Sequence, residues 1–163
     1  MEFRRHALPR LLAGLQIGML GGLLILAWFV AISHIYFGSP WALVNLFAML
    51  AGEGQWTVSL SRSTGIGAAV HLISCSLLGI FIAWLLPRPE PGDRTSIAGM
   101  AFGVIVSLLV YEFLWRRMLP ALAGTIAPLP IFIAHGLFGA SLAQFPRFFL
   151  PLVSEPPEVD PQP

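Results

Sequence analysis

Long apolar runs separated by short polar breaks form the main pattern of this chain. Residues 11–61 contain one formally charged residue, Glu53, and residues 63–87, 95–111 and 121–146 contain none. A helix of roughly 20 apolar residues is long enough to cross a hydrocarbon core of about 30 Å. The pattern therefore predicts an all-α integral membrane protein that lies in a lipid bilayer.

The polar and proline-rich breaks divide the apolar sequence into a predicted four-transmembrane-helix bundle. Proline and glycine clusters mark the ends of the helices, because proline cannot continue a helix and glycine favours turns. The predicted spans are residues 11–36, 64–86, 95–118 and 129–149. An even number of crossings places both termini on the same side of the membrane.

Two further segments complete the predicted domain organisation. Residues 39–51 are too short to span but too apolar for an ordinary loop, so we expect a short interfacial helix between the first two spans. A re-entrant segment is the alternative. Residues 1–150 then form the transmembrane domain, and residues 151–163, with five prolines and three acidic residues, form a disordered tail.

Composition and charge agree with a membrane protein and indicate its orientation. The chain has 163 residues, of which 56% are hydrophobic and 10% charged, whereas soluble domains have about 25% charged residues. Six of the nine arginines lie on the side of the termini, which predicts cytoplasmic termini. The arginines form no basic stripe, so nucleic acid is not an expected partner.

Short motifs recur in the two halves of the chain. Gly18-Met19 followed by Gly22 in the first span resembles Gly99-Met100 followed by Gly103 in the third. His71 near the start of the second span corresponds in the same way to His135 in the fourth. Duplication of a helical hairpin would explain both matches, and chance similarity is the alternative.

Small residues spaced four apart form stripes along three of the spans. Such stripes let helices approach closely in lipid. The candidate helix-packing residues are Gly14, Gly18, Gly22, Gly99, Gly103, Gly136 and Ala140. They predict a tight bundle, a homo-oligomer or packing within a larger membrane complex.

Three ionisable residues fall at one predicted depth. His71 lies about 10 Å inside the second span, His135 about 9 Å inside the fourth, and Glu112 about 9 Å before the end of the third. Ionisable residues within spans are costly and are candidates for function. Two imidazoles and a carboxylate can bind a first-row metal, two histidines can ligate haem, and a Glu and His set can relay protons.

A purely structural interpretation of the same residues stays open. Glu112 and Arg116 are four apart and can form an intrahelical ion pair. His71 and His135 can hydrogen-bond across helices. The sequence has no metal-binding or nucleophile motif, so no catalytic residue is named and enzymatic activity is not the expected function.

Several runs of the chain resemble a group of uncharacterised bacterial four-span membrane proteins. The matching runs include Ser39-Pro40-Trp41, Ala69-Val70-His71, Ala134-His135-Gly136 and Phe145-Pro146-Arg147. The resemblance implies a small multi-pass protein of the bacterial inner membrane and assigns no catalytic residue.

These observations leave three functions to compare. The first is a non-enzymatic accessory or scaffold subunit of a membrane assembly, without a cofactor. The second is a redox subunit that binds haem or a metal through His71 and His135, with Glu112 as a further metal ligand. The third is a small proton-coupled permease.

Overall fold

The regular secondary structure of the described residues is entirely helical, with short turns and loops between the helices. The computed structural model describes residues 7–52, 56–85, 93–109, 113, 116–117 and 127–153. The elements are α2 (Ala7–Phe37), α3 (Ala42–Met49), α4 (Arg62–Leu85), α5 (Asp93–Leu109), α7 (Pro128–Leu142) and α8 (Phe145–Val153). The prediction of an all-α protein is confirmed.

Three helical stretches are long and apolar enough to cross a membrane. They are Ala7–Phe37, Arg62–Leu85, and Pro128–Val153, which joins α7 to α8. The third predicted span corresponds to α5, whose apolar part, Ile97–Val106, is shorter. Length and composition therefore establish three candidate spans among the described residues, and α5 is too short to be counted with them on these criteria.

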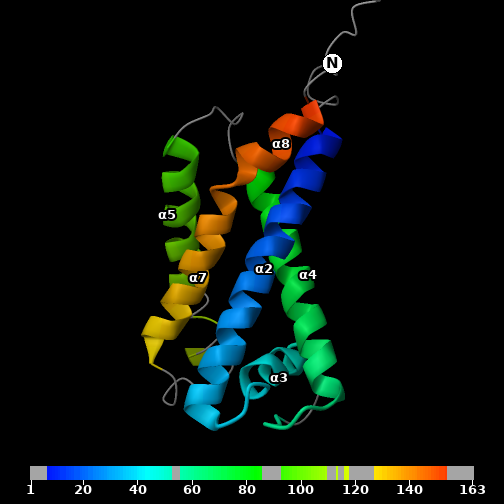
Figure 1. The fold of residues 1–163 in the computed structure, drawn as a ribbon, viewed down its shortest axis with the longest axis vertical. Coiled ribbons are helices and arrows are strands. Elements are labelled where there is room, and N and C mark those ends of the chain that lie inside the picture. The colour runs from blue at the N-terminus through cyan, green and yellow to red at the C-terminus, as the bar shows by residue number, and fades with distance from the viewer. Residues whose placement is uncertain are drawn as a thin grey trace, which may run out of the picture.

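The long helices lie side by side in the order α5, α7, α2, α4 (Figure 1). The closest pairs are α2 with α4 and α5 with α7, and α2 joins the two pairs by packing on α7. Neighbouring helices in this row run in opposite directions along the long axis (Figure 1). Many outward-facing side chains on these helices are large and apolar, as a lipid-facing surface requires.

Glycines bring α2 and α4 into backbone contact. A Cβ on Gly18 would meet the carbonyl oxygen of Cys75, and a Cβ on Gly79 would meet the carbonyl oxygen of Gly14. A Cβ on Gly22 would lie 2.9 Å from the Cβ of Cys75. The stripe in the first span is therefore used within the chain, against α4.

Glycines also bring α5 and α7 together. A Cβ on Gly99 would lie 3.0 Å from the carbonyl oxygen of Gly139, and one on Gly103 would lie 2.5 Å from the carbonyl oxygen of His135. By contrast, a Cβ on Gly136 would meet nothing within 4 Å, and Ala140 is exposed. Gly136 and Ala140 thus do not form a packing stripe among the described residues.

A network of polar contacts fixes α3 against the start of α4 and the segment that precedes it. Asn45 is 1% exposed, and its amide donates to the carbonyl oxygens of Thr57 at 2.6 Å and Ser59 at 2.9 Å. Its side-chain oxygen accepts from the Thr64 hydroxyl at 2.6 Å. Helix α3 lies between the ends of α2 and α4, with six of its eight residues buried (Figure 1).

The C-terminal part of the predicted organisation differs from the structure in two places. The fourth span, predicted as residues 129–149, is interrupted at residues 143–144, and Pro146 lies in the first turn of α8, where its missing N–H leaves no hydrogen bond unmade. Helix α8 then packs on α2 and continues to Val153. The predicted tail therefore begins three residues too early, and its remaining residues, 154–163, lie outside the described part.

Candidate functional site

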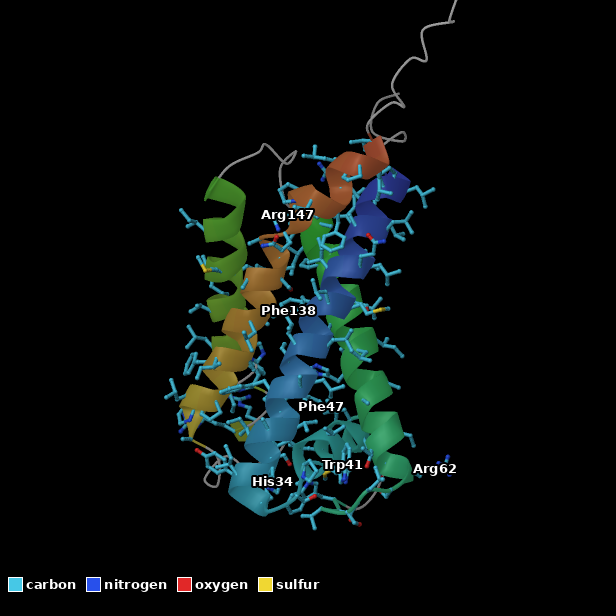
Figure 2. The ribbon with its side chains drawn as sticks, in the orientation of Figure 1. His34, Trp41, Phe47, Arg62, Phe138 and Arg147 are labelled. Carbon is cyan, nitrogen blue, oxygen red and sulfur yellow. The ribbon has the colours of Figure 1, made fainter. Side chains whose placement is uncertain are left out.

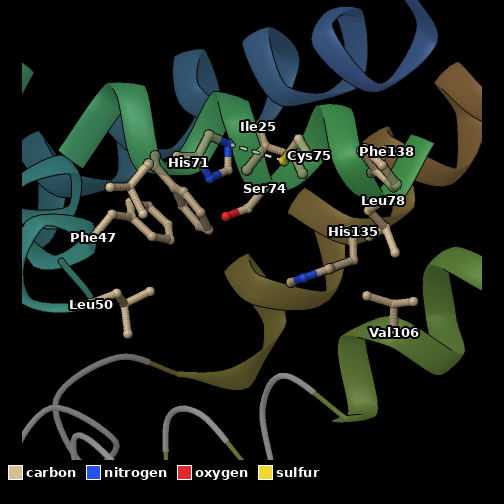
Figure 3. Close-up of a pocket in the computed structure, with 12 residues that line it drawn as sticks. Ile25, Phe47, Leu50, His71, Ser74, Cys75, Leu78, Val106, His135 and Phe138 are labelled. Atoms are coloured by element: carbon tan, nitrogen blue, oxygen red, sulfur yellow. Dashed lines mark hydrogen bonds between the residues drawn. The ribbon is translucent and has the colours of Figure 1, made fainter. Parts of the chain in front are cut away.

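A cavity of about 300 Å³ lies among α2, α3, α4, α5 and α7. Most of the twelve side chains that line it are apolar (Figure 3). The exceptions come from two helices: His71, Ser74 and Cys75 from α4, and His135 from α7. Ser74 is exposed and His135 is half-buried, so the cavity is partly open. Figure 2 shows the described side chains on the ribbon, with the lining residues Phe47 and Phe138 labelled.

His71 connects α4 to α2. Its Nε2 lies 3.1 Å from the carbonyl oxygen of Gly22, and the Sγ of Cys75 lies 3.6 Å from the same nitrogen. Because a carbonyl oxygen only accepts, Nε2 carries the hydrogen and donates it to Gly22. In the neutral ring, Nδ1 is then an acceptor, and it points away from Gly22.

His135 makes a different contact. Its Nδ1 lies 2.8 Å from the carbonyl oxygen of Ile131, one turn earlier in α7. By the same reasoning Nδ1 donates, so Nε2 is the acceptor in the neutral ring. The tip of the His135 side chain points from α7 toward the space beside Ser74 (Figure 3).

Aromatic rings surround His71 at one end of the cavity. The Phe47 ring centroid lies 4.7 Å from that of His71, and the Phe29 centroid lies 6.3 Å away at a steep angle. Phe47 belongs to α3, so this short helix forms part of the cavity wall.

The structure brings together two of the three residues predicted to share one depth. His71 and His135 line the same cavity, whereas Glu112 lies outside the described residues. The proposed metal set and the Glu112–Arg116 ion pair both involve Glu112 and stay predictions. Among the described residues, no group of three His, Cys, Asp or Glu side chains is placed to hold a metal ion.

Ser74 and Cys75 line the cavity and were not among the predicted site residues. They follow His71 by three and four residues, a spacing that places side chains on one helix face. Because His71 was a candidate site residue, this spacing could have indicated that Ser74 and Cys75 lie beside it in the same site. Asn45 was not among the predicted site residues, because its burial depends on contacts with residues 12 to 19 positions away.

Comparison with protein-family models, with curated proteins and with solved structures finds no match for this chain. The resemblance to uncharacterised four-span bacterial membrane proteins therefore stays a prediction.

Proposed function

We propose that the chain crosses the membrane four times, with α5 as the third crossing. Helix α5 lies alongside α7 and overlaps it along the long axis (Figure 1), and it contacts α7 through Gly99, Gly103 and Gly139. Its outward side chains, among them Ile97, Val104 and Leu108, are about half exposed, which suits contact with lipid. A helix packed alongside a spanning helix in this way occupies the same layer of the bilayer.

The four crossings are two copies of one helical hairpin in this proposal. Gly18 approaches Cys75 in the first pair as Gly99 approaches Gly139 in the second. Cys75 and Gly139 each follow the histidine of their own helix by four residues. The matched sequence motifs therefore make matched contacts, which supports duplication over chance similarity.

The function that the geometry supports best is non-enzymatic binding of a small lipophilic molecule inside the membrane. The cavity carries this proposal: it is within the size range of small-molecule sites, its walls are mostly apolar, and a few polar groups converge on it. His71 and His135 lie about 13 Å and about 10 Å along their helices from the helix starts, at a depth where the available ligands are lipophilic.

The proposed location is the bacterial inner membrane with cytoplasmic termini, and it rests on features of the sequence. The distribution of arginines supports cytoplasmic termini. The resemblance supports the bacterial inner membrane. A role as an accessory subunit of a larger membrane assembly fits a small protein whose task is binding, and such a partner would co-purify with it.

A phenylalanine at position 74 is expected to fill the cavity and displace its occupant. Wild-type protein, purified in mild detergent and examined by native mass spectrometry, should retain a lipophilic molecule, and Ser74→Phe should lower its occupancy several-fold. Leu77→Phe is the matched control, because Leu77 lies on the same helix, is 61% exposed and does not line the cavity.

Two outcomes would contradict the binding function: wild-type protein that carries no lipophilic molecule, or equal occupancy in the Ser74 and Leu77 variants. Haem or a stoichiometric metal in the wild-type sample would instead favour the second candidate, a redox subunit. One observation favours that candidate: His135 donates Nδ1–H to a backbone carbonyl and keeps Nε2 for a ligand, as metal-binding histidines do.

A further inference from the structure

We infer that the cavity binds lipophilic molecules of the phenol and hydroquinone class, and that it prefers a hydroquinone to the corresponding quinone. This inference rests on the proposed binding function and names the chemistry of its ligand. It follows from the hydrogen-bonding state of the two imidazoles and from the aromatic side chains beside them.

Both histidines line the cavity, and each has one ring nitrogen outside its hydrogen bond to a backbone carbonyl. The Nε2–H of His71 is directed to Gly22 and the Nδ1–H of His135 to Ile131. Backbone carbonyls thereby hold each neutral ring in one tautomer, with His71 Nδ1 and His135 Nε2 as acceptors. A ligand that pairs with both nitrogens must bring hydrogen-bond donors.

The rest of the lining restricts the ligand further. The described lining residues include no Asp, Glu, Lys or Arg, which favours an uncharged ligand. Phe29, Phe47 and Phe138 offer rings against which a planar aromatic group can pack. An uncharged aromatic ring with hydroxyl groups meets these requirements, and the two hydroxyls of a hydroquinone can serve both acceptors.

The same geometry disfavours the oxidised form. The carbonyl oxygens of a quinone accept hydrogen bonds, and two acceptors facing each other form none. A polar group left unpaired in an apolar site costs binding free energy. The Ser74 hydroxyl can donate or accept, so it serves either form and does not reverse the preference.

Three probes of similar shape test this inference: duroquinol, duroquinone and durene. Each is a planar six-membered ring with four methyl groups, and the two remaining positions carry hydroxyls, carbonyl oxygens and hydrogens, respectively. Binding to the full chain in lipid nanodiscs, measured by equilibrium dialysis under argon against empty nanodiscs, should be about tenfold tighter for duroquinol than for duroquinone. Duroquinol should also bind more tightly than durene.

The variant His135→Phe should lower the ratio of duroquinol to durene affinity at least threefold. This substitution is structurally mild, since the imidazole bonds only to a carbonyl of its own helix among the contacts described for it. Ile133→Phe is the matched control on the same helix, outside the cavity lining, and should keep the wild-type ratio.

The probes separate failure of this inference from failure of the proposed function. If durene binds but duroquinol and duroquinone bind equally, or if duroquinone binds more tightly, the cavity holds lipophilic molecules and the inferred ligand class is wrong. If none of the three binds above empty nanodiscs, the proposed function is wrong as well. An unchanged affinity ratio in His135→Phe would overturn the role of its imidazole.

Discussion

Gly18→Leu is expected to separate α2 from α4 and to destabilise the folded protein by about 3 kcal/mol or more. The new side chain would begin against the backbone of α4, at the carbonyl oxygen of Cys75 and 2.8 Å from the Cα of Ser76. The backbone of α4 cannot move aside as a flexible side chain can, so α2 and α4 must move apart. Contacts along the largest helix interface would be lost, including the bond from His71 to Gly22.

Gly136→Leu is the control for that substitution. Gly136 also lies in a helix and in a predicted small-residue stripe, but a Cβ there meets nothing within 4 Å. Thermal unfolding in mild detergent should therefore show a large loss of stability for Gly18→Leu and little change for Gly136→Leu. Equal losses would contradict the assignment of close backbone contact to α2 and α4.

Gly67→Ala is expected to displace α3 from α4, at a cost of about 2 kcal/mol. A single added methyl group would collide with the carbonyl oxygen of Val44 and lie 3.3 Å from the backbone nitrogen of Ala48. Phe47 in α3 and Leu50, directly after α3, both line the cavity. Displacement of α3 would therefore also open one end of the cavity. The variant should thus lose both stability and retention of the lipophilic molecule.

Gly65→Ala, two residues away in the same helix, should stabilise the protein slightly, whereas Gly67→Ala destabilises it. A Cβ at Gly65 meets nothing within 4 Å, and alanine favours helix over glycine by up to about 1 kcal/mol. The two variants can be compared by thermal unfolding and by native mass spectrometry of the same preparations. A Gly67→Ala protein as stable as Gly65→Ala would show that α3 does not dock through this contact.

Much of the helical organisation could be predicted from the sequence, because charge and proline are excluded from apolar helix interiors for simple physical reasons. The ends of α2 and α4 fall within four residues of the predicted spans. The break between α7 and α8 was harder to place, since Pro146 can either kink a helix or begin one. Its outcome depends on how α8 packs on α2, which local sequence does not encode.

The candidate site was predictable in part. Depth counting indicated that His71 and His135 fall at one level, and both line one cavity. Which way each ring turns depends on long-range contacts, such as the one between His71 and Gly22, which are 49 positions apart. For the same reason, the sequence could not show that His71 bridges two helices while His135 bonds within its own.

The account depends most directly on four crossings, and cysteine labelling in intact cells tests it. Single cysteines are placed before α2 crosses (Ala7), at the start of α4 (Ser61), at the start of α5 (Asp93) and before α7 (Ala127), with native Cys75 left in place because it is buried. Four crossings predict that a membrane-impermeant maleimide reaches the cysteines at 61 and 127 from outside, and those at 7 and 93 only after permeabilisation. Labelling of positions 93 and 127 from the same side would contradict it.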